Sequence, residues 1–129
     1  MKNKKKYGEL EVNQFDINNP QNFWPNTHKK NYKINIKLPE FMCRCPMSGY
    51  FDFATIYIQY IPNSLVIELK ALKLYINSFA SKYISHENSS NEIYDTIYEK
   101  LQPKKLKLTA VFNPRGNVST KIVIDSEDI

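Results

Sequence analysis

The order of two hydrophobic periods along the chain constrains its fold more than any other feature. Strict alternation of apolar and polar side chains over residues 32–38 predicts a half-buried strand, which Pro39 is expected to end. A second strand is predicted over residues 53–61, where Ile, Tyr and Thr are frequent. Residues 65–69 are predicted to continue as a short extended run.

The helical period follows in the middle of the chain. Apolar residues recur at helical spacing and predict a first helix over residues 71–80. A second helix is predicted to begin at Ser89, because Glu92 stands three residues later, as in a capping box. Pro103 is expected to end this helix, since proline cannot continue the hydrogen-bond ladder.

The last part of the chain returns to alternation, over residues 106–112 and 120–124, with residues 113–117 joining the two strands. Two strands, two helices and two strands joined by short turns predict an α+β fold, an antiparallel four-stranded sheet with two helices on one face. Such a sheet leaves one face and both edges uncovered, and closing several sheets into a multi-subunit barrel would remove both problems. The pattern therefore predicts a homo-oligomer.

Length and composition set the domain organisation. Residues 31–129 are predicted to form one domain, and residues 1–30, which are polar and rich in Asn and Lys, a flexible arm. No apolar run approaches the roughly 20 residues of a membrane helix, and the basic start has no apolar segment behind it. A cytoplasmic location without a membrane partner is therefore predicted.

The formal charge of +5 raises the question of nucleic acid. Most positive charges are clustered lysines, whereas arginine, which base readout and bidentate phosphate binding favour, occurs only at Arg44 and Arg115. Lysines in such clusters are typical of a solvated face, so no direct nucleic-acid partner is predicted. An anionic small substrate or cofactor would use the same surplus of charge.

Cys43 and Cys45 are the only cysteines, and they are too close together to form a disulfide framework. With only His28 and His86 as further soft ligands, neither the spacing nor the number matches a structural zinc pattern. No metal is therefore predicted.

Cys45 stands where a strand is expected to break into a loop, since a proline follows it and Gly49 supports a turn. Asp52 could fold back near the sulfur. A thiol and an acid together suit attack on an electrophilic carbon, with the acid supplying a proton to the developing anion. The alternative is an inert free cysteine, because free cysteines are commonly buried without further role.

Glu68 lies at the end of the short extended run, and Lys70 and Lys73 follow where the first helix begins. A carboxylate in this position can hold a polar heterocycle, and lysines at a helix N-terminus can hold a phosphate. The alternative is an ordinary charged first turn.

His86 and Glu87 are predicted to lie in the loop between the two helices. A histidine is the usual proton carrier near neutral pH, and the adjacent carboxylate could pair with donors on a substrate ring. Arg115 is predicted in the turn of the last hairpin, where it could meet an anion. The alternatives are a surface pair on a loop and a cation that caps the hairpin.

Taken together, these motifs resemble those of the NADPH-dependent 7-cyano-7-deazaguanine reductases, the nitrile reductases of the queuosine pathway. The similarity covers residues 32–124 and matches the short, single-domain members in length. The motifs are Cys45-Pro46-Met47-Ser48-Gly49-Tyr50-Phe51-Asp52, Glu68-Leu69-Lys70-Ala71-Leu72-Lys73-Leu74-Tyr75, His86-Glu87 and Phe112-Asn113-Pro114-Arg115-Gly116.

The resemblance implies the tunnelling fold, a multi-subunit barrel with active sites at subunit interfaces. It implies that Cys45 adds to the nitrile carbon to give a covalent thioimidate and that Asp52 is the proton donor. The residues expected to hold the purine-like ring are Ile67, Glu68, Leu69, His86 and Glu87, with Ile67 and Leu69 acting through their backbone.

The resemblance also implies NADPH as cofactor, which reduces the nitrile to the amine of 7-aminomethyl-7-deazaguanine. With only three glycines the chain has no Gly-x-Gly-x-x-Gly loop, so NADPH is expected across an interface. Lys70, Lys73 and Arg115 are the expected phosphate partners. Leu69 departs from the family, which usually has a small hydroxyl residue there, and Cys43 is either a bystander or a redox partner.

Two other functions remain open on the sequence. A GTP cyclohydrolase-like pterin or purine enzyme would share the fold but would need a zinc ligand set of Cys and His, for which the second half of the chain has no Cys. A basic RNA-binding module would use the lysine clusters alone and predicts salt-sensitive RNA affinity.

Overall fold

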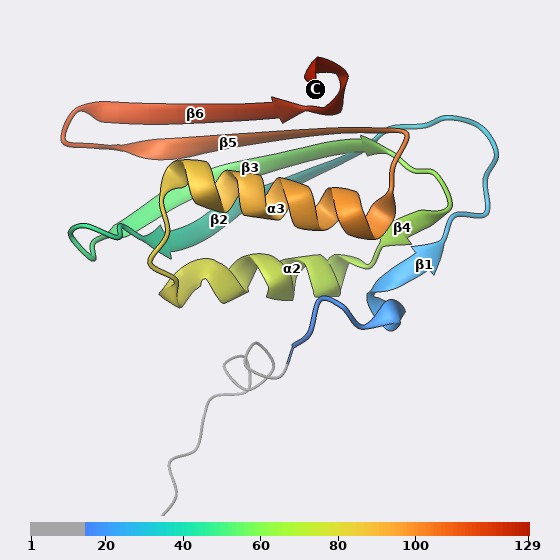
Figure 1. Ribbon diagram of the computed structural model, residues 1–129, viewed down its shortest axis with the longest axis horizontal. Helices are drawn as coiled ribbons and strands as arrows, with labels where there is room; N and C mark the ends of the chain where they lie inside the picture. The colour runs from blue at the N-terminus through green and yellow to red at the C-terminus, as the bar shows by residue number, and fades with distance from the viewer. Residues whose placement is uncertain (1–14) are drawn as a thin grey trace, which may run out of the picture.

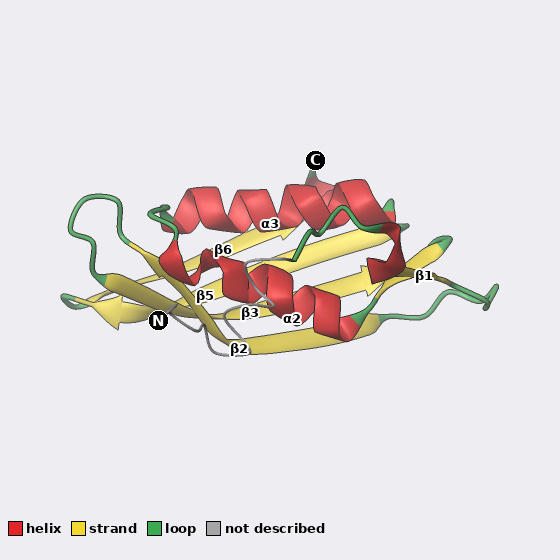
Figure 2. Cartoon of the chain, turned by 90° about the horizontal axis from the view of Figure 1, so that it is seen from below, coloured by secondary structure: helices red, strands yellow, loops and turns green. Residues whose placement is uncertain are grey.

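A four-stranded antiparallel sheet is the centre of the computed structural model, which describes residues 15–129 (Figure 1). Its strands are β2 (Ile34–Arg44), β3 (Phe51–Ile61), β5 (Lys105–Arg115) and β6 (Val118–Asp125), in the order β2-β3-β5-β6. The two helices, α2 (Leu69–Asn77) and α3 (His86–Leu101), lie side by side on one face of this sheet (Figures 1 and 2). The predicted α+β class, with an antiparallel four-stranded sheet and two helices on one face, is confirmed.

The hydrophobic core lies between the helices and the sheet. Every second residue of β3 and β5 points toward the helices and is buried, for example Ile56 and Leu108. Aromatic rings join the layers, since the ring of Phe41 lies 5.7 Å from that of Phe79 and 6.1 Å from that of Phe112. Burial of this apolar surface is the main term that stabilises the packing of the helices on the sheet.

Pro39 and Pro114 do not end their strands but lie within shifts of register. The predicted end of the first strand at Pro39 is wrong, because β2 continues to Arg44 across a register shift between Leu38 and Phe41. A second shift, between Phe112 and Arg115, contains the proline of β5. Proline has no N–H to donate, so a strand accommodates it at a bulge and then resumes pairing.

The last hairpin is tighter than predicted. Its turn consists of Gly116 and Asn117, with φ of 59° and 76°, and Arg115 pairs with Val118 across it. Two positive φ values are typical of a type I′ turn, which matches the twist of the flanking strands. The predicted connection over 113–117 therefore shortens to two residues, and Arg115 ends a strand.

Both helices begin earlier than their patterns predicted. For α2, predicted over residues 71–80, Glu68 is the N-cap, and η2 (Ser78–Ser81) continues the chain after Asn77. For α3, the cap is Ser85, whose hydroxyl oxygen accepts the N–H of Asn88 at 3.0 Å. The predicted start at Ser89 is wrong, because that hydroxyl is buried and donates back to the carbonyl of the preceding turn.

The start of α3 changes the position of two site residues. His86 and Glu87 form the first turn of the helix and do not lie in a loop between helices. Their side chains are therefore carried by a rigid element whose position is set by the packing of α3 against β5 and β6.

A small second sheet closes one end of the domain. β1 (Phe23–Pro25), which follows η1 (Pro20–Asn22), pairs antiparallel with β4 (Leu65–Ile67). Residues 15–30 of the predicted arm thus contact the domain, while residues 1–14 lie outside the described residues. The chain ends in η3 (Ser126–Asp128) and, within residues 15–129, contains no helix long and apolar enough to cross a membrane.

Candidate active site

The loop that carries Cys45 is a short, internally bonded turn between β2 and β3. The N–H of Cys45 donates to the carbonyl of Tyr50 at 2.8 Å, and its carbonyl accepts the N–H of Gly49, also at 2.8 Å. Gly49 has φ of +77°, a conformation that other residues rarely adopt. The loop therefore holds Cys45 at a defined position directly after the strand.

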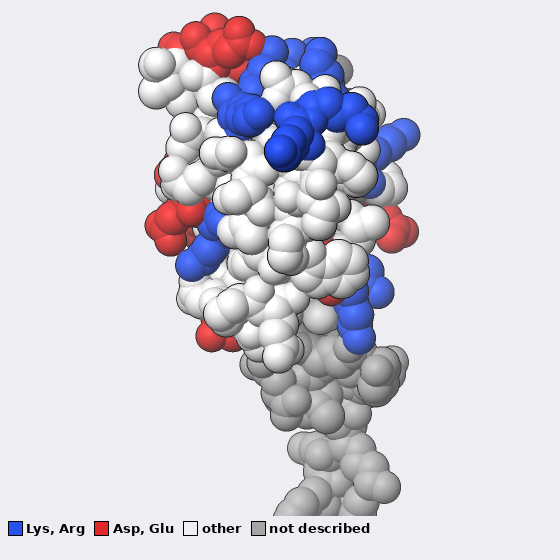
Figure 3. All heavy atoms as spheres, turned by 90° about the vertical axis from the view of Figure 1, so that its right-hand side faces the viewer, with Lys and Arg blue, Asp and Glu red and all other residues white. Residues whose placement is uncertain are grey.

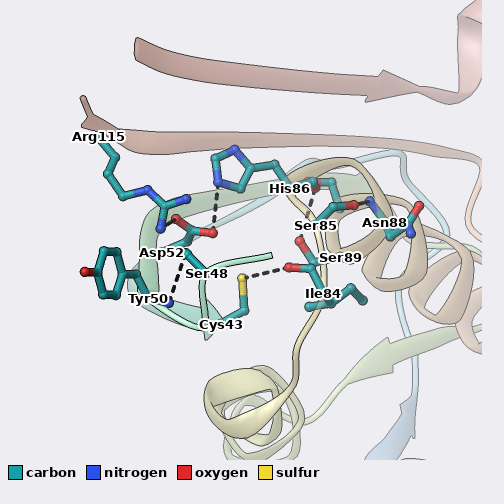
Figure 4. A network of polar contacts seen from close by, with 11 residues as sticks. Cys43, Ser48, Tyr50, Asp52, Ile84, Ser85, His86, Asn88, Ser89 and Arg115 are labelled. Carbon is teal, nitrogen blue, oxygen red and sulfur yellow. Dashed lines mark hydrogen bonds and ion pairs between the residues drawn. The ribbon is translucent and has the colours of Figure 1, made fainter. Parts of the chain in front are cut away.

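Asp52 is the buried acid of this end of the sheet, with 6% of its surface exposed. Arg115 Nη1 lies 3.1 Å from Asp52 Oδ1, and His86 Nε2 lies 3.3 Å from Asp52 Oδ2 (Figure 4). Taking a carboxylate out of water is costly unless charged or hydrogen-bonding partners replace the water, and the Arg115 guanidinium and the His86 imidazole do so. The result is a cluster of three functional groups from β3, β5 and α3.

A buried aromatic ring fixes the histidine. The imidazole of His86 stacks on the ring of Phe112, with 3.8 Å between centroids and 7° between planes. Phe112 is fully buried within the core, so the imidazole has a rigid floor. In this orientation the Nε2 atom of the imidazole points at the Asp52 carboxylate, as Figure 4 shows.

The two cysteines differ in chemistry although a single residue, Arg44, lies between them. Hydrogen bonds from the hydroxyl and backbone of Ser48, followed by Arg115, lower the pKa of Cys45 from the ordinary 9.0 to about 6. Burial, followed by the charge of Asp52, raises the pKa of Cys43 to about 11. Cys43 has no exposed surface and its thiol contacts the carbonyl of Ile84 at 3.7 Å. Only Cys45 is therefore a thiolate near neutral pH, the form that reacts.

Glu68 does not belong to the cluster around Asp52, because it lies at the N-terminus of α2. Its carboxylate caps α2, accepting the backbone N–H of Lys70 at 2.6 Å and of Ala71 at 3.1 Å. Beside it lies a largely apolar hollow of about 410 Å³, lined by residues that include Trp24, Tyr32, Tyr60, Ile67, Glu68 and Leu69. The backbone N–H of Ile67 donates to the hydroxyl of Tyr60 at 3.2 Å, which ties β4 to the end of β3.

The predicted site residues thus fall into two groups at opposite ends of the sheet (Figure 1). The thiol end contains Cys45, Asp52, His86, Glu87 and Arg115, whereas the carboxylate end contains Ile67, Glu68 and Leu69. Asp52 is the second residue of β3 and Tyr60 the tenth, so about 26 Å of strand separates the two ends.

The remaining two candidates, Lys70 and Lys73, lie near the N-terminus of α2, at the same end of the molecule as Glu68. Lys70 and Lys73 lie on its first turns, and both are exposed. On this side of the molecule, basic side chains gather at the top, above a mostly uncharged surface (Figure 3), whereas α2 lies low in Figure 1.

Sequence reasoning missed three contributors to this geometry. Ser48 provides the largest influence on the Cys45 thiol, Phe112 supports His86, and Trp24 lines the hollow beside Glu68. A hydroxyl three residues after the cysteine was the one local signal for Ser48. The roles of Phe112 and Trp24 depend on contacts between distant segments, for which the sequence pattern carries no signal.

Fold and site together describe a class of protein, an α+β domain with a cysteine of lowered pKa and a buried acid at one end of its sheet. Comparisons with known proteins narrow this class. Residues 51–129 match the model of the family described as QueF-like protein. The chain is 66% identical over 122 residues to the NADPH-dependent 7-cyano-7-deazaguanine reductase of Sulfurovum sp., covering 95% of this chain and 98% of that protein.

Further relatives agree with this match. The enzyme of the same description from Nitratiruptor sp. is 61% identical over 124 residues, covering 96% of this chain and 95% of the relative. A crystal structure of the archaeosine synthase QueF-Like in the apo form superposes with a TM-score of 0.70 at 21% identity, covering 76% of this chain and 96% of that chain. The last match shows the shared tunnelling fold. The chain belongs to the QueF-like protein family, among its NADPH-dependent 7-cyano-7-deazaguanine reductases.

Proposed function

We propose that the chain reduces the nitrile of 7-cyano-7-deazaguanine to the amine of 7-aminomethyl-7-deazaguanine with NADPH, in the queuosine pathway and in the cytoplasm. The observation that carries the proposal is the thiol end. Cys45, with a pKa of about 6, shares the Arg115 guanidinium with Asp52, which is buried and contacts both His86 and Arg115. That arrangement supplies the nucleophile and the proton that addition to a nitrile requires.

Cys45 and Asp52 divide the first step between them. The Cys45 thiolate forms a bond to the nitrile carbon, and one π pair of the carbon–nitrogen triple bond moves to nitrogen. A proton held between Asp52 Oδ2 and His86 Nε2, which lie 3.3 Å apart, is transferred to that nitrogen and completes a thioimidate. A protonated thioimidate accepts hydride far better than a nitrile does, so covalent catalysis divides a difficult reaction.

NADPH, when bound, supplies the hydrides. The exposed Lys70 and Lys73 on the first turns of α2 suit its phosphates, and Arg115 can contribute because a guanidinium has five donors and 44% of its side chain is exposed. These residues lie at both ends of the sheet, so the assignment of all three to one cofactor requires two copies of the chain.

The proposed contacts to the substrate ring also require two copies of the chain. Glu68, with the backbone of Ile67 and Leu69, is proposed to hold the ring, together with His86 and Glu87. About 26 Å of strand separates these two groups within one copy, which exceeds the size of a purine-like molecule. We therefore propose a homo-oligomer in which the carboxylate end of one copy faces the thiol end of the next. The exposed aromatic side chains at both ends, Trp24 and Tyr50 among them, suit burial in such an interface.

Intact-protein mass spectrometry tests the proposal. The protein is mixed with 7-cyano-7-deazaguanine without NADPH, and an adduct of substrate mass is expected. The adduct should be absent in Cys45→Ala and present in Cys43→Ala, the matched control two residues away. Absence of any adduct in the unchanged chain, together with no consumption of NADPH, would refute the function.

A further inference from the structure

Arg44 joins the two segments that carry the nucleophile and the histidine. It is the last residue of β2, directly before Cys45, and pairs in a parallel bridge with Tyr83. Its N–H donates to the carbonyl of Lys82, and its carbonyl accepts the N–H of Ile84, both at 2.9 Å. The main chain of Arg44 thus fixes the end of β2 against the segment that leads into α3.

The side chain of Arg44 extends this link to the loop. Its guanidinium lies between two rings, with Cζ 4.7 Å from the centroid of Phe51 and 5.0 Å from that of Tyr83. Its Nε donates to the carbonyl of Gly49 at 3.1 Å. A planar cation held by two rings and by one directed hydrogen bond has a defined orientation, which a lysine ammonium would not reproduce.

The carbonyl of Gly49 is a sensitive point of the loop. The same residue donates its N–H to the carbonyl of Cys45, and the neighbouring Ser48 supplies the hydrogen bonds that lower the pKa of the thiol. Gly49 is free to adopt several backbone conformations, because it has no side chain. A bond to its carbonyl removes that freedom and keeps Ser48 beside Cys45.

We propose that Arg44 is a positioning residue for the nucleophile, which holds the Gly49 carbonyl and thereby fixes the Cys45 loop against the segment that carries His86. The consequence for nitrile reduction rests on the proposed function, whereas the consequence for the thiol itself does not. Arg44 acts through Gly49 and Ser48 and does not need to touch the substrate.

The test compares Arg44→Leu and Arg44→Lys with Lys82→Met. Lys82 is the matched control, because it is a cation of the same segment whose side chain does not contact the Cys45 loop. Its ammonium lies 4.2 Å from the Phe79 ring centroid and 3.1 Å from a carboxylate oxygen of Glu92. Two rates are measured, the alkylation of Cys45 by iodoacetamide as a function of pH and the formation of the 7-cyano-7-deazaguanine adduct in a single turnover. Circular dichroism and light scattering record folding and assembly.

In Arg44→Leu we expect the midpoint of Cys45 alkylation to rise from about pH 6 toward 9.0, because the Ser48 donors are no longer held. Adduct formation should slow about tenfold, with a smaller change in KM, as expected for a displaced reacting group. Arg44→Lys keeps the cation between the rings but loses the directed bond, so its values should lie between. Lys82→Met should match the unchanged chain.

A folded Arg44→Leu protein with the original midpoint and adduct rate would overturn the inference. Loss of folding in both Arg44 variants would also overturn it, because the residue would then serve the fold as a whole. A shifted midpoint in a chain that forms no adduct even when unchanged would support the positioning role and reject the proposed function.

Discussion

The thiol end and the carboxylate end of the sheet are built in different ways. At the thiol end, polar side chains from three elements meet at the buried Asp52, with Arg115 at 3.1 Å and His86 at 3.3 Å, and a stacked ring fixes His86. At the carboxylate end, an apolar hollow has a single carboxylate, Glu68, which accepts two backbone N–H groups. One end has the thiol of lowered pKa, and the other has the apolar hollow beside a carboxylate. The proposed function treats these ends as two halves of one site that forms between copies of the chain.

Complementation between two impaired variants, assayed at substrate concentrations far below KM, gives the largest expected effect. Cys45→Ala should lower reduction by about 10⁴-fold or more, as loss of a nucleophile does. Glu68→Gln alters the other end. If sites form between copies, co-expressed oligomers of the two variants should regain about one quarter of full activity, because one interface in four pairs two unchanged ends.

The control for complementation pairs Cys45→Ala with Asp52→Asn, two changes at the same end. Those oligomers contain no site with an intact thiol end and should stay inactive. Equal inactivity of the Cys45→Ala and Glu68→Gln mixture, in oligomers shown to contain both chains, would mean that both ends serve a site within one copy.

The next largest effect is expected in the alkylation rates of the two cysteines. At pH 8, above the pKa of about 6 for Cys45 and below that of about 11 for Cys43, the first is mainly thiolate and the second mainly thiol. Reactivity appears as pH rises through each pKa, so Cys43→Ala should be alkylated about 10³ times faster than Cys45→Ala. Rates of iodoacetamide labelling measure the ratio. Similar rates would contradict the separate environments of the two thiols.

Glu68→Gln should act on substrate binding more than on the thiol. The amide keeps a shape similar to the carboxylate but loses its charge and one acceptor, so kcat/KM should fall about 10²-fold through a higher KM. The midpoint of Cys45 alkylation should stay at about 6. Glu99→Gln, an exposed acid near the end of α3, serves as the control for loss of a charge. A shifted midpoint in Glu68→Gln would show that the two ends are not independent.

Ser48→Ala should give the smallest effect. Removing its hydroxyl leaves the backbone donors and Arg115, so the pKa of Cys45 should rise only part of the way from about 6 toward 9.0. Alkylation at pH 6 should slow several-fold, and alkylation at pH 9 should hardly change. Ser81→Ala, an exposed serine of η2, is the control. An unchanged profile in Ser48→Ala would assign the activation of the thiol to Arg115 instead.

The strand order and the helix layer could be predicted because periods of two and 3.6 residues depend only on neighbouring residues. Element boundaries were less accurate, since Pro39 ends a strand only if no bulge is available and Ser89 caps a helix only if Ser85 does not. Those choices depend on pairing and packing with distant segments. The same reason explains why Cys45 and Asp52 were proposed from sequence, whereas Phe112 and Arg44 received no role.

The sequence by itself determined the α+β class and the family, and it proposed reactive residues such as Cys45 and Glu68 from the chemistry of their side chains. Only the tertiary structure decided where that chemistry lies. Eleven-residue strands place Cys45 and Glu68 at opposite ends of the sheet, and the start of α3 brings His86 to Asp52. The lowered pKa of Cys45 and the raised pKa of Cys43 follow from these placements, because electrostatic interactions depend on distance and burial. The proposal of a second copy rests on the same placements.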